Sequence, residues 1–285
     1  MKILITGASG MLGTAVREVF SNHELLTPTS KELDVRDIGS VAQYIKTKPD
    51  LILHLAAVTD HLKSELEWEN TYLTNHTGTQ NIISLSLTLD IPIVYIASCT
   101  EYDGSKEAHT EEDILSPCNH YSVSKAYGEW SIRANPKNWI IRSGWLFGGG
   151  PGIDKKFLNA IVYKLIKSGV KEFPSIVDSV GQPTYTYDLA RTIKNMIEGN
   201  APYGTYNVAG LGVASRFDMA TLFVSCLGAD VKVIPVTAEE YHKKYPEKVK
   251  YHKRAVMDLS KIQASGFSAM RPWEVTLKEY AEEFK

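Results

Sequence analysis

The chain has 285 residues, which is enough for one large core or for a larger domain that carries a smaller second lobe. Its 31 Lys and Arg against 33 Asp and Glu give a formal net charge of -2, which argues against general nucleic-acid binding. The three cysteines lack the spacing of a disulfide framework or a zinc site, and no stretch approaches the roughly 18 apolar residues of a membrane span. We therefore expect a cytoplasmic protein without a nucleic-acid or membrane partner. The eight histidines follow no ligand pattern, so we expect no catalytic metal.

Short apolar runs alternate with longer amphipathic stretches in the first half of the chain. This rhythm is typical of βαβ units, in which helices join parallel strands and pack on the sheet. It predicts the α/β class, with a Rossmann-type doubly wound parallel sheet. We expect strands at 2–6, 24–27, 50–57, 91–98 and 138–143, and helices at 11–21, 38–47, 66–89 and 121–134.

The character of the sequence changes after Trp145, where the glycine-rich run 147–152 predicts a loop. The segments that follow are shorter and mixed, which indicates a smaller mixed α/β lobe. We expect a larger domain of 1–144 plus parts of about 184–210, and a discontinuous lobe of about 145–183 and 211–285. The later expected helices are 155–168, 187–198 and 216–227, and the later expected strands are 171–177 and 204–208.

The turn between the first strand and the first helix contains Gly7, Gly10 and Gly13 in the pattern G-x-x-G-x-x-G. Gly7 would allow a tight reversal, Gly10 would let the backbone approach a phosphate, and Gly13 would allow the helix to pack closely on the sheet. Free N-H groups and the positive end of the helix dipole would face the anion. The turn therefore predicts binding of the pyrophosphate of a nicotinamide dinucleotide; a tight strand-helix connection without a ligand is the alternative.

The segment after the second strand bears on the choice of cofactor. A carboxylate at this place usually binds the ribose 2′-OH of NAD and repels a 2′-phosphate. This chain has Ser30 and Lys31 there and no acid before Glu32. We therefore expect NADP(H) to be preferred, with NAD(H) as the alternative. Asp34 is expected at the adenine edge, and the small Ala56 and Ala57 leave room for the cofactor.

Tyr121 and Lys125 lie four residues apart, so that on a helix both point to one face. A nearby ammonium stabilises phenolate, so we expect the pKa of Tyr121 to lie below its ordinary value of about 10. Such a tyrosine can donate a proton to the oxygen of a carbonyl that is being reduced. Ser98 ends an expected strand, at the edge where open α/β sheets bind ligands, and its hydroxyl could orient that oxygen. A surface pair of tyrosine and lysine is the alternative.

In combination, these features resemble the extended short-chain dehydrogenase/reductase superfamily, and more closely the dTDP-4-dehydrorhamnose reductase family. The resemblance covers nearly the whole chain. It is carried by the phrases GASGMLG, PDLILHLAAVTD, TNHTGTQN, SCTEYDGSKEAHTEED, YSVSKAYGE, IIRSGWLFG, DSVGQPTYTYDLA and MRPWEVTLKEY.

The resemblance implies catalytic roles for Ser98, Tyr121 and Lys125, a dinucleotide in the larger domain and a substrate in the smaller lobe. Trp145 would face the sugar, and Gln182 would lie near the entrance. The expected substrate contacts are Cys99, Thr100, Trp145 and Gln182. The expected cofactor contacts are Gly7, Ser9, Gly10, Met11, Leu12, Gly13, Ser30, Lys31, Asp34, Val35, Leu55, Ala56, Ala57, Thr59, Asn75, Tyr121 and Lys125.

The chain departs from the family pattern at 97–104, which reads Ala-Ser-Cys-Thr-Glu-Tyr-Asp-Gly where the family typically has Ser-Thr-Asp-Tyr-Val-Phe-Asp-Gly. Ser98 replaces threonine conservatively. Cys99 and Thr100 replace a pair that borders the sugar pocket, so the departure leaves the exact sugar open. Cys99 could be a reactive thiol, but a small packing residue is the favoured interpretation.

A basic stretch at 241–254 is interpreted first as a solvated surface. As the alternative, its Lys253 and Arg254 would meet the diphosphate of a nucleotide sugar.

The resulting hypothesis is an NAD(P)H-dependent oxidoreductase that reduces a 4-keto-6-deoxy nucleotide sugar, dTDP-4-dehydro-L-rhamnose or a close relative, with a homodimer as one possible state. Two alternatives stay open. One is a nucleotide-sugar epimerase or dehydratase with tightly held NAD. The other is a non-catalytic regulatory subunit that resembles the partner of methionine adenosyltransferase.

Overall fold

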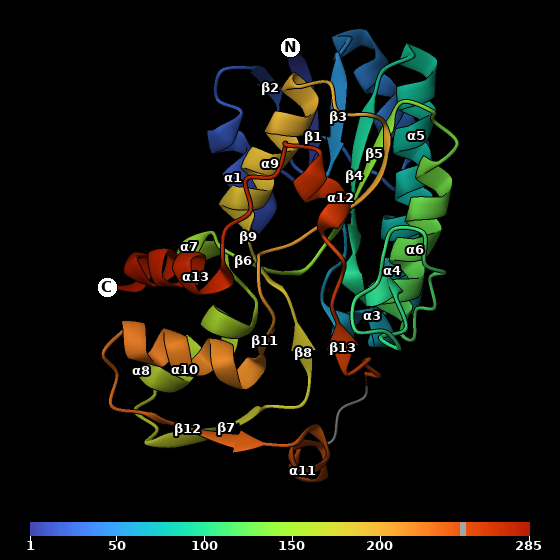
Figure 1. The fold of residues 1–285 in the computed structure, drawn as a ribbon. Coiled ribbons are helices and arrows are strands. Elements are labelled where there is room, and N and C mark those ends of the chain that lie inside the picture. Colours follow the sequence, from blue (N-terminus) through green and yellow to red (C-terminus); the bar gives the residue numbers. More distant parts are fainter. Residues whose placement is uncertain (246–248) are drawn as a thin grey trace.

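The computed structural model describes residues 1–245 and 249–285 and is built on a six-stranded parallel sheet (Figure 1). The strand order is β10-β5-β4-β3-β1-β2, and every neighbouring pair is parallel. The expected α/β class with a doubly wound Rossmann-type sheet is confirmed. The strands are β1 (Lys2–Thr6), β2 (Glu24–Leu26), β3 (Leu51–His54), β4 (Ile93–Ser98), β5 (Asn138–Ser143) and β10 (Gly204–Val208).

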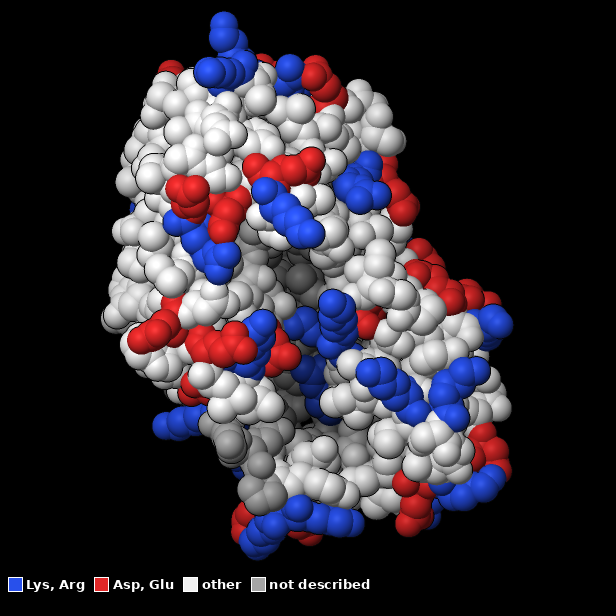
Figure 2. Space-filling model, turned by 180° about the vertical axis from the view of Figure 1, so that it is seen from behind, with Lys and Arg blue, Asp and Glu red and all other residues white. Residues whose placement is uncertain are grey.

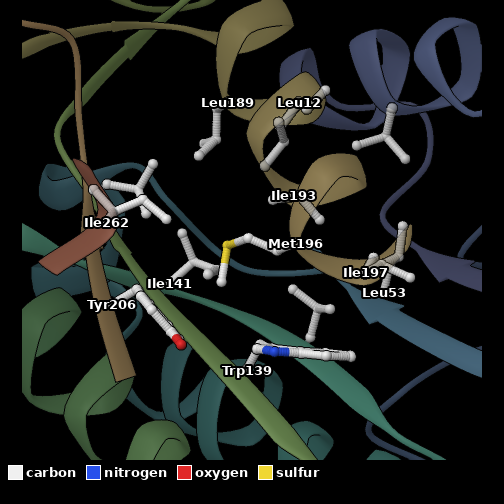
Figure 3. Close-up of a cluster of buried hydrophobic side chains, with 14 of the residues drawn as sticks. Leu12, Leu53, Trp139, Ile141, Leu189, Ile193, Met196, Ile197, Tyr206 and Ile262 are labelled. Atoms are coloured by element: carbon white, nitrogen blue, oxygen red, sulfur yellow. The ribbon is translucent and has the colours of Figure 1, made fainter. Parts of the chain in front are cut away.

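Helices cover both faces of this sheet. Successive side chains of each strand point to opposite faces, so both sets of side chains are buried. Ile3 and Ile5 of β1 belong to the hydrophobic cluster that contains α1 and α9, whereas Leu4 belongs to the cluster on the opposite face. Figure 3 shows side chains of α9 packed over the sheet, with Ile193 and Met196 among them. The helices are α1 (Met11–Val19) and α9 (Thr186–Glu198) on one face, and α2 (Ile38–Ala42), α5 (Gly78–Leu89) and α6 (His120–Ile132) on the other.

The order of the strands reverses at β1, which lies between β2 and β3. The connections from β1 and from β3 therefore leave the sheet in opposite directions. A crevice opens outside the carboxyl ends of the strands at such a point, and ligands of open α/β sheets bind there. Gly7 follows β1 and Leu55 follows β3, so the fold brings both expected segments to this crevice.

Four expected elements differ from the structure. The helix expected at 38–47 is α2 followed by a 3-10 helix (Gln43–Thr47), and the helix expected at 155–168 is a π-helical segment followed by α8 (Lys164–Lys167). The single helix expected at 66–89 is divided into α3 (His61–Leu66), α4 (Trp68–Tyr72), a π-helical turn (Leu73–Thr77) and α5. The expected loop at 147–152 contains the end of β6 (Trp145–Phe147) and a short helix, α7 (Gly150–Ile153). Pro151 fits the first turn of α7 because the N-H that proline lacks would have no partner there.

The second part of the chain forms a smaller lobe with its own hydrophobic cluster, which includes Phe147, Phe223 and Tyr280 (Figure 1). Small sheets pair β7 with β12, β6 with β9, and β8 with both β11 and β13. The sequence predicted a helix at 155–168, β7 and α10 here, but not β8, β9, β11 or the elements after α10. The helices of this lobe are a π-helical segment (Phe157–Tyr163), α8 (Lys164–Lys167), α10 (Arg216–Cys226), α11 (Ala238–Lys244) and α13 (Trp273–Ala281). α12 (Ser260–Ala264) instead packs beside β10 of the large sheet, and its Ile262 belongs to the hydrophobic cluster of that sheet. The strands are β7 (Glu172–Ile176), β8 (Val180–Gly181), β9 (Pro183–Tyr185), β11 (Ala214–Ser215), β12 (Lys232–Val236) and β13 (Arg254–Ala255).

None of the helices in the described ranges is both long and apolar enough to cross a bilayer.

A buried ion pair joins β5 to α6 behind the crevice. Arg142 Nε and Nη2 donate to the two carboxylate oxygens of Glu129 over 2.9 and 2.6 Å, and neither side chain is more than 2% exposed. Burial opposes the ionisation of Glu129, but the hydrogen bonds from Arg142 outweigh it and lower the pKa of the carboxyl. Arg142 Nη1 also donates to the Tyr102 hydroxyl and, over 3.0 Å, to the Glu111 carbonyl.

We expect Arg142→Met to lower the free energy of unfolding by about 3 kcal/mol, because it leaves a buried carboxylate without its main partner. Urea denaturation followed by circular dichroism measures the change. Lys63→Gln is the control, because Lys63 pairs with Glu67 on an exposed helix surface and its loss should cost about 0.5 kcal/mol or less. Equal stabilities of the two variants would show that the buried pair contributes nothing.

Candidate active site

The first turn of the sheet leaves no space for side chains on its inner side. Gly7 has a φ of +72°, and a Cβ there would lie 2.7 Å from the backbone nitrogen of Ala56. A Cβ at Gly13 would lie 2.5 Å from the carbonyl oxygen of Gly7. Gly10 is different: it is exposed, and a Cβ there would meet protein only at 3.4 Å. No side chain caps the start of α1, so its free N-H groups and the open side of Gly10 fit the pyrophosphate of a dinucleotide.

A cavity of about 770 Å³ runs from this turn along the carboxyl ends of β1, β3 and β4 and into the smaller lobe. Most of the residues expected to bind cofactor or substrate line it. They are Gly7, Ser9, Gly10, Met11, Leu12, Gly13, Ser30, Asp34, Val35, Leu55, Ala56, Ala57, Thr59, Ser98, Cys99, Thr100, Tyr121, Lys125 and Trp145.

Three expected contacts do not line the cavity: Lys31, Asn75 and Gln182. Lys31 is exposed at the surface. Asn75 accepts a hydrogen bond from the Val58 backbone N-H over 2.8 Å and donates to Ser124 Oγ over 3.0 Å, so it ties the segment after β3 to α6. The Gln182 amide accepts from the Met257 backbone N-H over 2.9 Å and donates to the Met257 carbonyl over 3.1 Å. Asn75 and Gln182 thus stabilise segments of backbone near the cavity.

The fold brings Ser98, Tyr121 and Lys125 together. Ser98 is the last residue of β4, and its Oγ lies 2.8 Å from Thr100 Oγ1. Asn119 caps α6 by accepting from the Ser122 backbone N-H, so the helix begins one residue before Tyr121. Tyr121 and Lys125 are both buried on this helix, and the Tyr121 side chain lies within interaction range of Ser98.

Burial governs the protonation of Tyr121. Removal from water disfavours phenolate and raises the pKa of Tyr121 above its ordinary value, although the interaction with the Ser98 side chain acts in the opposite direction. The expected lowering by the neighbouring ammonium is therefore wrong for this structure. Tyr121 is protonated at neutral pH, which is the form that donates a proton.

Lys125 is directed toward β4. Its Nζ lies 4.0 Å from the centroid of the Tyr95 ring, and the Tyr95 hydroxyl donates to the Lys125 carbonyl over 3.0 Å. Burial lowers the pKa of Lys125 to about 8, while the charges of Glu101 and Glu129 oppose this shift. The ammonium thus lies over the Tyr95 ring face, and the charges of the two acids favour its protonated form.

Cys99 lies directly beside this site and is buried. Burial raises the pKa of its thiol to about 12, so the thiol is not ionised at neutral pH. This agrees with the packing interpretation of Cys99.

Several charged residues of the cavity were missed from the sequence. Arg36 lines the cavity and donates through Nε and Nη2 to the Asp34 carboxylate over 2.9 and 2.7 Å. The only available signal was its place two residues after Asp34. His61, Lys156 and Arg216 also line the cavity. They are far apart in the sequence, so no motif could have joined them.

The basic stretch contributes none of its described residues to the cavity. Lys253 pairs with Asp178 over 3.1 Å, and Arg254 Nε donates to the Glu107 carbonyl over 2.7 Å. Residues 246–248 lie outside the described residues. Lys253 and Arg254 agree with the surface interpretation, whereas the ring of Tyr251 lies 5.2 Å from that of His61, which lines the cavity.

Cations dominate the lining. Asp34 is the only acid among the lining residues that the structure describes, and Figure 2 shows blue side chains inside and around a central hollow. In the described ranges no group of three or more His, Cys, Asp or Glu could hold a metal ion. The cavity is thus suited to ligands that carry phosphate groups. The lining cations are Arg36, Lys125, Lys155, Lys156 and Arg216.

Comparison with known proteins places this geometry in a family. The model of the RmlD substrate binding domain matches residues 1–285. The spore coat polysaccharide biosynthesis protein SpsK of Bacillus subtilis is 30% identical, and the alignment covers 99% of this chain and 97% of SpsK. A dTDP-4-dehydrorhamnose reductase structure from Clostridium acetobutylicum has a TM-score of 0.92 at 32% identity and covers 100% of this chain and 99% of its own. A dTDP-4-dehydrorhamnose reductase from Bacillus anthracis, in complex with NADP, has a TM-score of 0.91 at 29% identity and covers 99% of both chains. The chain belongs to the RmlD substrate-binding domain family.

Proposed function

We propose that this chain is an NAD(P)H-dependent reductase that converts dTDP-4-dehydro-L-rhamnose, or a close 4-keto-6-deoxy nucleotide sugar, to the corresponding alcohol in deoxysugar synthesis. One observation carries the proposal. A buried, protonated Tyr121 lies within interaction range of Ser98 and beside Lys125, in a cavity that begins at a dinucleotide turn. The names of the solved relatives support the same reaction.

Ser98, Tyr121 and Lys125 each have a separate role in the proposed reaction. A reduced nicotinamide supplies the hydride when the cofactor is bound. Ser98 Oγ orients the carbonyl oxygen of the sugar, and the Tyr121 hydroxyl gives its proton to that oxygen as negative charge develops. Lys125 binds the nicotinamide ribose, and its positive charge stabilises the phenolate that remains on Tyr121.

The alternatives fit the site less well. A dehydratase would be expected to carry an Asp-Glu pair after the serine, where this chain has Cys99 and Thr100. A regulatory subunit would have no need of Ser98, Tyr121 and Lys125 together.

NADP(H) is the preferred cofactor in this proposal, with NAD(H) as a second possibility. The relative from Bacillus anthracis is in complex with NADP. In this chain Arg36 lies beside Ser30 and Asp34 in the cavity lining and keeps N-H groups beyond those bound to Asp34 and Asn70. These groups can bind a ribose 2′-phosphate.

The domain boundaries and the cytoplasmic location stay predictions. Support for the two-part division comes from the separate hydrophobic clusters of the sheet and of the smaller lobe, and from β10, which returns to the sheet beside β5.

The homodimer also stays part of the proposal. Trp68, Tyr127 and Trp130 are exposed on neighbouring helices, and ring contacts through Tyr72 link them into one apolar surface. If a second copy covers this surface, light scattering should give twice the chain mass, and Trp130→Glu should give the monomer mass. A monomeric wild type would contradict the dimer.

We expect Tyr121→Phe to lower kcat for the 4-keto sugar by about 100-fold or more, because it removes the proton donor while the ring keeps its packing. Oxidation of NADPH at 340 nm measures the rate, and fluorescence titration should show an unchanged Kd for NADPH. Tyr127→Phe is the matched control, because Tyr127 is exposed on the same helix. A wild-type rate for Tyr121→Phe would remove Tyr121 from the mechanism.

We expect Arg36→Gln to raise the Kd of NADPH about 10-fold, because a charge-assisted hydrogen bond to the phosphate is lost. The Kd of NADH should stay within about twofold, since NADH has no 2′-phosphate. Lys31→Gln should change neither value, because Lys31 does not line the cavity. Equal losses for the two cofactors, or a loss of NADPH binding in Lys31→Gln instead, would contradict the assignment of Arg36.

A further inference from the structure

Arg216 presents a charged group to the cavity that the described residues do not neutralise. It is the first residue of α10, and no carboxylate forms an ion pair with it in the part of the chain that the structure describes. Its Cζ lies 4.1 Å from the centroid of the Trp145 ring and 4.9 Å from that of Phe157. Its hydrogen-bonding contact is a long one, 4.0 Å from Nη1 to the Met219 sulfur.

Arg142 provides a contrast within the same chain. It is almost fully buried, whereas Arg216 is only partly exposed to the cavity, and it donates to both carboxylate oxygens of Glu129. Removal from water lowers the pKa of Arg216 to about 10, so Arg216 still carries its charge at neutral pH. A charge that is partly removed from water is costly unless an opposite charge compensates it. A bound anion can supply this compensation for Arg216.

Two further side chains face the same space. Lys156 Nζ donates to the carbonyl and Oγ1 of Thr59, at 2.7 and 3.1 Å, and interacts electrostatically with Arg216. Asp60 and Asp154 offset the charge of Lys156 in part. The ring of His61 lies 4.3 Å from that of Tyr121, and its buried Nδ1 has no hydrogen-bond partner in the structure.

The pKa of His61 reflects its burial and the positive charges of Lys156 and Arg216. Burial lowers the pKa of His61 to about 4, and the charges of Lys156 and Arg216 lower it further against the opposing effect of Asp60. His61 is therefore neutral at neutral pH. Its Nδ1, which has no partner in the structure, can donate or accept a hydrogen bond with a ligand.

The position of Arg216 indicates which ligand it meets. The pyrophosphate of the cofactor has its own donors at the glycine turn, whereas Arg216 lies over the Trp145 ring and lines the cavity together with Ser98 and Cys99. We propose that Arg216, with Lys156 and His61 beside it, binds the diphosphate of a nucleoside-diphosphate sugar. The planar guanidinium can donate two parallel hydrogen bonds to phosphate oxygens, and the two rings fix its plane. The inference rests on the proposed function for the identity of the sugar nucleotide.

The test compares dTDP with thymidine as ligands of the NADP⁺-saturated enzyme by calorimetry. Arg216→Met keeps an unbranched side chain between the two rings and removes the charge. We expect its Kd for dTDP to rise about 10- to 100-fold, while its Kd for thymidine and that for NADPH stay within about twofold. Arg216→Lys keeps the charge without the fork and should show a smaller loss. Lys253→Met, from the basic stretch, should behave as wild type because Lys253 pairs with Asp178.

Three outcomes would overturn the inference: an unchanged Kd for dTDP in Arg216→Met, an equal loss for dTDP and thymidine, or a loss confined to NADPH. If Arg216→Met does not fold, Arg216→Gln takes its place in the same titrations. The titrations contain no keto sugar, so they do not depend on turnover. Selective loss of dTDP binding in an enzyme that reduces no 4-keto sugar would refute the proposed function alone. Reduction that survives with unchanged dTDP binding in Arg216→Met would refute this inference alone.

Discussion

The candidate site depends on one constraint, which is that the carboxyl ends of β1, β3 and β4 meet at a single edge of a parallel sheet. The turn after β1 must pass directly against the backbone after β3. Only residues without a Cβ allow this approach at Gly7 and Gly13. Because the chain comes this close, Gly10 and the free N-H groups of α1 open into the same cavity as Ser98.

Burial then sets the protonation of each group in that cavity. It raises the pKa values of Tyr121 and Cys99 and lowers those of Lys125 and His61. Tyr121 thus holds a proton that it can donate, and Cys99 is kept from acting as a nucleophile. Desolvation has a larger effect on Tyr121 than the ammonium one helical turn away, which is why reasoning from sequence spacing gave the opposite direction.

Reasoning from the sequence succeeded where a local pattern reports a local structure. The strands from β1 to β5, the glycine turn and the Tyr121/Lys125 pair all follow from periodicity and spacing within short segments. It failed where the chain is brought together from distant segments. His61, Lys156 and Arg216 come from three parts of the sequence, and only packing of the smaller lobe against the sheet domain joins them. The ligand contacts that the resemblance implies for Asn75 and Gln182 stay predictions, and in the structure both amide groups bind backbone near the cavity.

The most direct test of this account is a crystal structure of the enzyme with NADP⁺ and a dTDP-sugar product bound together. The account predicts the nicotinamide ribose at Lys125 and the C4 oxygen of the sugar within hydrogen-bonding distance of the Ser98 and Tyr121 hydroxyls. A sugar bound with its C4 oxygen away from both hydroxyls, or a dinucleotide bound away from the glycine turn, would contradict it.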